Sequence, residues 1–472
     1  MRVLCLSTYE LGQQPVGLGA EVALLEAAGH EVSAADLSVE AFPAEAAAAA
    51  EAVVFSVTMH TATELSLQAA RRITDQSGKR PFAFLGLYAP VLDGHELVGD
   101  QDLLAAGETG EALLGWLEAL EAGESRARSG VEVSIGRPRP LSGPLPARRR
   151  LPPLERYARY LEKDRAILVA GVETTRGCNH SCRHCPVAAI YGGRSRAVEL
   201  EAVLADVDQA VSLGAGHISF LDPDFLNRPR HAMAVAAGLA ARHPGLSFDA
   251  TIKIEHLNRH RELLEPLAGY GLSFVTSAFE STDDRVLALL DKGHTAAGAR
   301  QAVAACRRAG IEIRPSWLPF NPWTTLSSLA SLLDFAARAD LVASTDAVQY
   351  SIRLLLPTGS LLLREPDPVL EAALGPESTG NSSWRHSEPA IDALQAEVAA
   401  LVAREPAGSD PVGSFEAIWR LMAKAGAPLP REIPQPEGEL ASHLAAGERP
   451  RLTEAWFCCA EPTAAQLEAV SG

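Results

Sequence analysis

The chain has 472 residues, of which 47% are hydrophobic and 21% charged, a composition typical of an ordinary globular protein. This length is enough for two or three domains with cores of their own. The formal net charge of −17 argues against binding to nucleic acid or to a membrane surface, because phosphate groups repel an acidic body. It does not exclude a small anionic substrate in a local basic site.

The sequence holds no run of about 18 apolar residues, so we expect no membrane span. Its first residues, MRVLCLSTYELG, indicate a buried strand and lack the long apolar core of a secretory signal. The seven cysteines are an odd number, and most stand in two tight clusters. This pattern is a poor disulfide framework and suits a reducing compartment, so we expect the protein in the cytoplasm. Cys5 and Cys306 are expected to be buried in the core.

Residues 1–125 alternate between predicted strands and helices, which indicates a doubly wound, Rossmann-like α/β domain with a parallel sheet. The predicted strands are at 2–7, 31–37, 52–58 and 81–89. The predicted helices are at 17–30, 44–52, 63–74 and 110–123.

The rest of the chain divides into three stretches. Residues 126–165 are rich in proline and arginine and are expected to form an extended linker, because proline fixes φ and removes a hydrogen-bond donor. Residues 166–375 alternate again, and six predicted β/α units indicate a partial barrel. Residues 376–472 are predicted to form a helical C-terminal region. The six expected barrel strands are at 167–174, 217–224, 246–252, 273–281, 311–319 and 348–357.

The stretch ETTRGCNHSCRHC follows the first of these strands and holds Cys178, Cys182 and Cys185 in the spacing C-x3-C-x2-C. Thiolates are the usual ligands of iron–sulfur clusters, and a four-iron cluster normally takes four of them. Only three lie in this stretch, so one iron of a [4Fe–4S] cluster would be open to a ligand from outside the protein. An open metal position is typical of a site that performs chemistry.

Two other metal sites agree with the same cysteines. His180 or His184 would complete a structural zinc site of three cysteines and one histidine, although zinc motifs more often consist of two separated pairs of cysteines. An electron-transfer ferredoxin would carry a fourth cysteine nearby. The sequence favours the open [4Fe–4S] cluster over both alternatives.

The cysteine motif and the six β/α units resemble the radical S-adenosylmethionine (SAM) superfamily over about residues 166–360. The segments HISFLDPDFL, SAFESTDDRVLALLDKGHT, PFNPWTT and SIRLLLPTGS resemble strand ends of its barrel. His184 departs from the pattern, because the family usually has Tyr or Phe before the last cysteine. The resemblance implies a [4Fe–4S] cluster, SAM bound to its open iron, and an external electron donor that allows a C–S bond of SAM to be broken.

Four further residues are candidates for SAM binding by this resemblance. Asp222 and Asp224 occupy an acidic turn after the second strand, and Glu280 ends the fourth strand, where the family has a glutamate in contact with SAM. Arg353 is a candidate for the SAM carboxylate or for barrel closure. Barrel sites form at these C-terminal strand ends. The alternative is that Glu280 and Arg353 form ion pairs that are only structural, either with each other or with local partners inside the barrel.

A Rossmann-like domain before such a barrel resembles the cobalamin-dependent branch of the superfamily. The cobalamin motif of that branch is D-x-H-x-x-G, in which the histidine binds cobalt. The comparable residues 7–12, STYELG, keep Gly12 but have neither the aspartate nor the histidine. His60, after the third strand, could contact a ligand or be solvated. The sequence therefore allows cobalamin but favours a cobalamin-binding-like domain without it.

The sequence near the C-terminus, EAWFCCAEPTAAQ, contains the adjacent cysteines Cys458 and Cys459. Neighbouring cysteines do not easily form a disulfide with each other, but two soft thiolates together favour a thiophilic partner. The string CCAEP resembles the CUAEP/CCAEP-tail group of radical SAM proteins, including members that act in arsinothricin biosynthesis. The resemblance implies that Cys458 and Cys459 are catalytic and present trivalent arsenic to SAM. Two idle thiols in a disordered tail are the alternative.

Three functional hypotheses follow. The first is a radical SAM transferase that moves the 3-amino-3-carboxypropyl group of SAM to thiol-bound arsenic, with arsenite as the small-molecule substrate. The second is cobalamin-assisted methylation, or another radical modification, of a small natural product. The third is a non-catalytic protein that binds a metalloid or carries electrons. The third needs no SAM site, so the segments around Glu280 and Arg353 argue against it.

Overall fold

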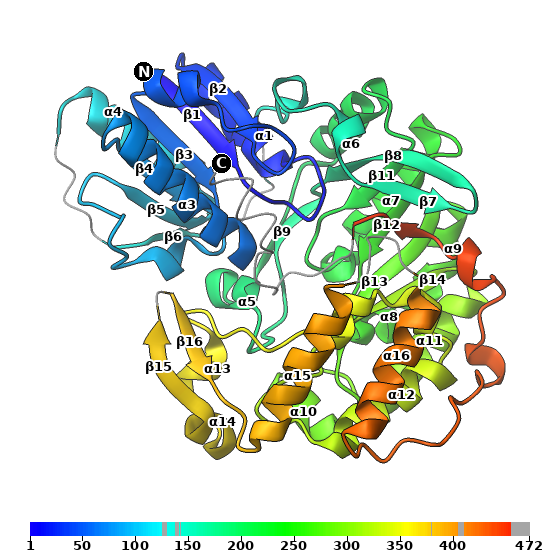
Figure 1. Cartoon of the computed structure of the whole chain (residues 1–472). Coiled ribbons are helices and arrows are strands. Elements are labelled where there is room, and N and C mark those ends of the chain that lie inside the picture. The colour runs from blue at the N-terminus through cyan, green and yellow to red at the C-terminus, as the bar shows by residue number, and fades with distance from the viewer. Residues whose placement is uncertain (125–129, 137–140, 142, 379, 405–409, 455–472) are drawn as a thin grey trace.

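The computed structural model describes residues 1–124, 130–136, 141, 143–378, 380–404 and 410–454 (Figure 1). Its first sheet has six parallel strands in the order β2-β1-β3-β4-β5-β6, with helices on both faces. The strands are β1 Arg2–Ser7, β2 Glu31–Asp36, β3 Ala52–Ser56, β4 Phe82–Leu85, β5 Leu103–Gly107 and β6 Glu132–Ser134. The helices are α1 Val16–Ala27, α2 Ala44–Ala49, α3 His60–Ser77 and α4 Gly110–Glu121. The Rossmann-like fold is confirmed.

Side chains of β1 point alternately to the two faces of this sheet, as a strand requires. Val3 and Cys5 pack in the core under α1 and α4, whereas Leu4 and Leu6 pack in the core under α2 and α3. All four side chains are buried. The short apolar runs of the sequence therefore become central strands that are covered on both faces, which is why they contain few polar residues.

The second sheet curls into a partial barrel, with strand order β14-β13-β12-β11-β8-β7-β17. The strands β8, β11, β12, β13 and β14 are parallel, whereas β7 and β17 are antiparallel and close the edge beside β8. The parallel strands are β8 Arg165–Val172, β11 His217–Phe220, β12 Ser247–Thr251, β13 Leu272–Glu280 and β14 Glu312–Trp317. The edge strands are β7 Arg159–Glu162 and β17 Arg451–Leu452.

Helices cover the outside of the barrel sheet and enclose the largest hydrophobic core of the molecule (Figure 1). They are α6 Leu200–Ser212, α7 Pro229–Arg242, α8 Ile254–Arg259, α9 Leu264–Gly269, α10 Asp284–Leu289, α11 Ala296–Arg308 and α12 Leu326–Arg338. Cys306 is fully buried on α11, as the sequence predicted.

The expected sixth strand is reduced to one bridge. Ile352 O accepts from Phe320 N at 3.2 Å, and Leu354 N donates to Phe320 O at 2.8 Å, so Arg353 pairs with Phe320 in parallel. The residues before this point form a 3-10 turn, Ala347–Tyr350, instead of strand. The barrel thus has five full parallel strands and a closing contact at the sixth position.

The stretch expected to be an extended linker is more ordered than predicted. Part of it is strand β6, which pairs with Ala105–Gly107 of β5 and completes the first sheet. Arg148 is fully buried, and its guanidinium donates to both carboxylate oxygens of Asp206 on α6, at 2.6 and 2.7 Å. The buried Arg148–Asp206 pair explains why this stretch is ordered and not an extended linker, because a buried arginine requires a charged partner that a solvated linker lacks.

The C-terminal region contains two long helices and a strand pair, so it is not only helical (Figure 1). The short helices α13 Leu361–Arg364 and α14 Pro368–Ala373 precede this region, which begins within β15 Leu374–Ser378 and continues with β16 Asn381–Trp384, α15 Pro389–Val402 and α16 Pro411–Lys424. The helices α15 and α16 bury Ile391, Leu394, Phe415 and Ile418 in the barrel core.

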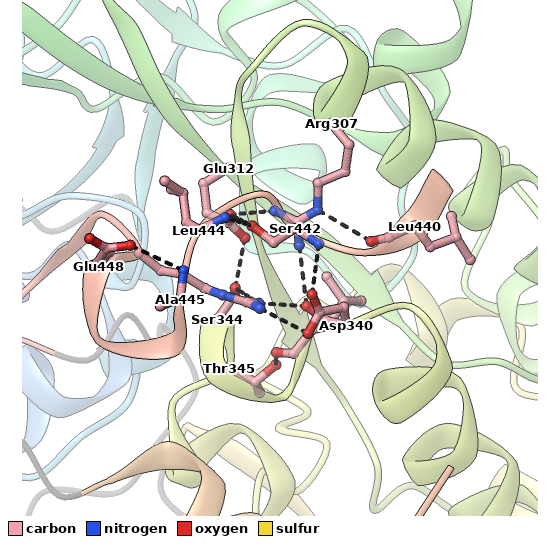
Figure 2. A network of polar contacts seen from close by, with 12 residues as sticks. Arg307, Glu312, Asp340, Ser344, Thr345, Leu440, Ser442, Leu444, Ala445 and Glu448 are labelled. Carbon is pink, nitrogen blue, oxygen red and sulfur yellow. Dashed lines mark hydrogen bonds and ion pairs between the residues drawn. The ribbon is translucent and has the colours of Figure 1, made fainter. Parts of the chain in front are cut away.

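A buried polar network fastens the last described segment to the outside of the barrel (Figure 2). Glu312 of β14 pairs with Arg307 and accepts from Ser344 Oγ at 2.7 Å. Asp340 accepts from Ser442 N at 2.7 Å and from Arg449 Nη2 at 2.8 Å. The charges of Arg307 and Arg449 hold the pKa of the Glu312 carboxyl below its usual value, although burial acts in the opposite direction. The network brings the chain back to β7, where β17 adds to the sheet.

Candidate active site

The three cysteines of the motif lie on one loop at the C-terminal edge of the barrel sheet. Strand β9 (Thr175–Gly177) leads into Cys178, and helix α5 (Pro186–Tyr191) begins directly after Cys185. Proline at the first helical position is compatible with this abrupt start, because it has no backbone N–H to satisfy. Strand β10 (Ser195–Ala197) returns antiparallel to β9 and fastens the base of the loop.

Gly177 is required at the start of this loop. Its φ is +75°, and a Cβ at this position would lie 2.4 Å from Arg194 O and 2.5 Å from the Tyr191 ring. Gly192, at the end of α5, has a φ of +57° but meets no atom closer than 3.7 Å. The first glycine is needed for space as well as for conformation, whereas the second is needed for conformation only.

The sulfur-bearing side chains all line one cavity, Cys178 and Cys182 being buried and Cys185 half-buried. Asn227 holds the loop from the barrel side: its Oδ1 accepts from Asn179 N at 2.9 Å and lies 3.7 Å from Cys178 Sγ. Burial raises the pKa of Cys178 to about 11 and that of Cys185 to about 12. These thiols are therefore neutral unless a cation offsets the burial of the thiolate, which is what a metal cluster provides.

The spacing of the three sulfur atoms fits a cluster better than a single zinc ion. In the part of the chain that the structure describes, they do not all lie within 4.8 Å of one another. Zinc with bonds of 2.3 Å would hold them about 3.8 Å apart. The two candidate histidine ligands are also engaged elsewhere, His180 with Asp224 and His184 with Glu280, each at 3.1 Å. The donor set thus fits three irons of a [4Fe–4S] cluster.

Glu280 ends β13 at a register shift, with a φ of +61°, and its side chain turns toward the cysteine loop. Its Oε1 contacts both His184 Nε2 and Lys292 Nζ at 3.1 Å. Burial alone would raise the pKa of Glu280, but Lys292 and His184 hold it well below its usual range. All hydrogen bonds and ion pairs of the Glu280 carboxylate with described residues involve Oε1, and Glu280 belongs to the cavity lining. Glu280 is therefore an ionised carboxylate with one oxygen free for a ligand.

The acidic turn after β11 points inward, but its two carboxylates already have partners. Asp222 accepts from Thr174 N at 2.7 Å and from the hydroxyls of Thr174 and Thr175 at 2.5 and 2.7 Å. Burial raises the pKa of Asp222 to about 6, although these hydrogen bonds lower it. Asp222 thus fixes the strand that leads to the cysteine loop. Asp224 contacts His180 and His256.

Arg353 is not placed where the sequence predicted a contact with SAM. Its guanidinium pairs with Asp392 at 2.6 Å, donates to Trp384 O at 2.8 Å and lies 3.5 Å above the Trp384 ring. The side chain does not line the cavity, whereas its neighbours Ile352 and Leu354 do. Its position agrees with the alternative of barrel closure. Glu280 and Arg353 do not pair with each other, but each forms a local ion pair, Glu280 with Lys292 and Arg353 with Asp392.

The cavity has a volume of about 1540 Å³ and lies between the strand ends of both sheets. Arg176 lines this cavity and links the two domains. Its guanidinium lies 2.9 Å from Glu173 of the barrel and 3.1 Å from Glu108 of the first domain. No sequence pattern indicates Glu173, Glu108 or Lys292, because only the fold brings them beside the cysteine loop. Arg176 stands two residues before Cys178, and that position was the only local signal.

The first domain contributes two further carboxylates to the lining. Glu10 accepts from Ser56 Oγ at 3.2 Å and from Thr58 Oγ1 at 3.0 Å, and burial raises its pKa to about 7. Burial raises the pKa of Glu21 to about 8, and its Oε2 is buried with no hydrogen-bond partner. This wall can therefore offer both hydrogen-bond donors and acceptors at neutral pH.

Three residues that the sequence singled out, His60, Cys458 and Cys459, are not among the described residues that line the cavity. His60 is buried at the start of α3, beside Tyr88 and Asn381, and it is neither solvated nor part of the lining. Cys458 and Cys459 lie outside the described residues. The catalytic role predicted for these two cysteines therefore stays a prediction.

Comparison with known proteins decides the class of the barrel. The family model of the radical SAM superfamily matches residues 172–319, which include the cysteine loop and strands β11 to β14. The chain has a radical SAM domain. Such a domain implies a [4Fe–4S] cluster and SAM, for which the loop and Glu280 provide the donors described above.

Curated relatives of the radical SAM domain match only parts of the chain. A Methanocaldococcus jannaschii protein named as a methylthiotransferase is 23% identical over 199 residues, 40% of this chain and 43% of that protein. The bacteriochlorophyllide d C-12(1)-methyltransferase of Chlorobaculum tepidum is 26% identical over 122 residues, 25% of this chain and 26% of that protein. The chain thus spans less than half the length of either relative.

Solved structures share the fold of both domains. The cobalamin-dependent radical SAM enzyme OxsB, with aqua-cobalamin bound, has a TM-score of 0.66 at 12% identity, over 90% of this chain and 71% of OxsB. The radical SAM methyltransferase TsrM of Kitasatospora setae, with cobalamin and a [4Fe–4S] cluster bound, has a TM-score of 0.59 at 15% identity, over 90% and 88% of the two chains. The fold of this chain, over 90% of its length, is therefore shared with these two enzymes. No helix among the described residues is long and apolar enough to cross a membrane.

Proposed function

We propose that this chain is a radical SAM transferase that moves part of SAM onto a small molecule held between its two domains. The observation that carries the proposal is that Cys178, Cys182 and Cys185 line the same cavity as the strand ends of the first domain. When bound, a reduced [4Fe–4S] cluster supplies the electron that breaks a C–S bond of SAM, and its open iron holds the methionyl group. An external electron donor completes the system.

The residues of the chain then bind and orient SAM. Glu280 stays ionised because of Lys292 and His184, so its free Oε2 can accept hydrogen bonds from the SAM ammonium group. Asp222 holds the strand before the cysteines in place. Apolar side chains from both domains, among them Leu87, Val187 and Leu354, line the same cavity and exclude water from the reacting groups.

The size of the cavity supports a second large ligand besides SAM. Single small-molecule sites measure about 300–1,000 Å³, whereas this cavity measures about 1540 Å³. OxsB and TsrM, which share the fold, hold cobalamin. Among the described residues, no histidine of the first domain lines the cavity, so cobalamin would bind here without a protein histidine on cobalt. Cobalamin-assisted methylation of a small natural product is the reaction that these observations favour.

A second candidate is the transfer of the 3-amino-3-carboxypropyl group to trivalent arsenic, as in ArsL of arsinothricin biosynthesis. Its support is the pair Cys458 and Cys459 in the sequence, since adjacent soft thiolates suit arsenite. The described cavity contains no second group of thiols besides the cysteine loop, so this candidate depends entirely on the tail.

The two candidates leave different remnants of SAM. Cobalamin-assisted radical methylation would leave S-adenosylhomocysteine from the SAM that gives up its methyl group, and methionine and 5′-deoxyadenosine from a second SAM cleaved at the cluster. Loss of the aminocarboxypropyl group leaves 5′-methylthioadenosine. The reconstituted full chain is incubated anaerobically with SAM and a reductant, with and without hydroxocobalamin and arsenite, and the products are measured by mass spectrometry. Arsenic-dependent 5′-methylthioadenosine that is lost in Cys458→Ser and Cys459→Ser would establish the second candidate and reject the first. If wild-type enzyme with an intact cluster yields no SAM-derived product, the proposed function is wrong.

A further inference from the structure

Three potential metal ligands meet beside the cysteine loop but belong to no part of the cluster site. His180 lies on the loop itself, Asp224 follows β11, and His256 lies on α8, which follows the neighbouring strand β12. One ligand atom from each residue lies within 4.8 Å of the other two. These side chains therefore converge from three adjacent elements at the strand ends where barrel sites form.

The three residues are in close contact, but only His180 and Asp224 are aligned for a hydrogen bond. Asp224 Oδ2 lies 3.1 Å from His180 Nε2 and 2.7 Å from His256 Nδ1. The side chain of His256 is only 7% exposed, yet its Nδ1 has no hydrogen-bond partner. Tetrahedral bonds of 2.0–2.1 Å would separate neighbouring ligand atoms by about 3.3 Å. The 3.1 Å distance is close to this value, and the 2.7 Å distance would lengthen when an ion binds.

Charge and burial also call for a cation at this point. Asp224 is only 1% exposed, and its other oxygen, Oδ1, accepts from Leu226 N at 3.1 Å. Glu255 Oε2 lies 3.6 Å from His180 Nδ1, on the side of that ring where a carboxylate often stands behind a metal-bound histidine.

We propose that His180, Asp224 and His256 form a second metal site that binds one divalent transition-metal ion, such as Zn²⁺ or Fe²⁺, next to the cysteine loop. Two imidazoles and one carboxylate suit these ions, whereas Mg²⁺ and Ca²⁺ prefer oxygen ligands only. His180 and Asp224 line the cavity, so the remaining position of the ion faces it. Three protein ligands and an open position are typical of a metal that binds water or a substrate atom.

The proposal is tested by cobalt binding to the full chain with its cluster in place. Reconstituted protein is freed of loosely bound metal with a chelator and titrated with Co²⁺ alone, while iron is quantified in parallel. We expect one Co²⁺ per chain with unchanged iron. X-ray absorption at the cobalt edge should show nitrogen and oxygen neighbours with imidazole scattering and no sulfur.

Two variants separate this site from its surroundings. His256→Ala should weaken Co²⁺ binding at least about 100-fold, because even loss of an outer-shell partner costs 10–100-fold. His260→Ala is the matched control, because its ring lies 5.5 Å from that of His256 but outside the group, and binding should be retained. Absence of saturable binding, a sulfur shell around cobalt, or equal affinity of wild type and His256→Ala would each overturn the proposal. The X-ray absorption spectrum of cobalt-loaded wild-type protein tests the ligand set even if a variant fails to fold.

Discussion

Lys292 supplies the charge that keeps Glu280 ionised in a buried position. Its Nζ lies 3.1 Å from Glu280 Oε1, and its side chain is only 4% exposed. The charge of Glu280 raises the pKa of Lys292 although burial lowers it, so each residue maintains the charge of the other. The cysteines were predictable because their spacing is local, whereas Lys292 and His256 were not, because their place beside the loop depends on the packing of distant strands.

Removal of this charge should destabilise the fold. We expect Lys292→Met to lower the free energy of unfolding by about 3–5 kcal/mol, because it leaves a carboxylate buried without its cation. Urea denaturation monitored by circular dichroism measures the change. Lys424→Met is the control, because Lys424 is exposed at the end of α16 and its replacement should alter stability by no more than about 0.5 kcal/mol. Equal stability of the two variants would show that the charge of Lys292 does not stabilise the buried Glu280 carboxylate.

Glu10 should make the fold less stable as pH rises. Burial raises its folded-state pKa from 4.5 to about 7, so the folded state holds the proton more tightly than the unfolded state. The stability that this protonation contributes is complete below about pH 4.5 and is lost as pH approaches about 7. In Glu10→Gln this part of the pH dependence should be missing, whereas Glu118→Gln, on the exposed face of α4, should keep it. Parallel pH profiles for wild type and Glu10→Gln would contradict the account.

At the scale of elements, the antiparallel pair β9 and β10 decides whether the cysteines converge. The loop between these strands carries all three thiols, and Asn227 and Asp222 support it from the barrel. Apolar runs predicted the long strands well, but β5 was missed because its alanines do not distinguish strand from helix. Strand β6 was missed because its three residues stand in a proline-rich stretch and pair only through the completed sheet.

Gly177→Ala should impair cluster assembly without unfolding the protein. The new Cβ would clash with the backbone of Arg194 and the Tyr191 ring, so the loop must shift at its base. We expect reconstituted iron and sulfide per chain to fall below about half of the wild-type content, with an unchanged circular dichroism spectrum. Gly192→Ala also has a positive φ but an open surrounding, and it should cost about 1 kcal/mol while retaining full iron content. Full iron in Gly177→Ala would mean that the loop tolerates the shift.

At the scale of the molecule, the two domains line one shared cavity. Arg148 pairs with Asp206 of the barrel domain and Arg176 with Glu108 of the first domain, so both sides of the cavity are fixed by ion pairs. The alternation of strands and helices predicted both folds, since each depends on local periodicity. The cavity between them could not be predicted, because no sequence pattern states how two sheets face each other. For the same reason, the sequence could not decide between the two roles predicted for Arg353, SAM binding and barrel closure.

The central claim is that Cys178, Cys182 and Cys185 hold a [4Fe–4S] cluster with one iron open to SAM. The most direct measurement is electron paramagnetic resonance of the anaerobically reconstituted and reduced full chain, with iron analysis, before and after addition of SAM. We predict about four irons per chain, a signal that changes when SAM binds, and loss of both in the variant with all three cysteines changed to alanine. A triple variant that keeps the same cluster signal, or a wild-type signal that SAM leaves unchanged, would contradict the claim.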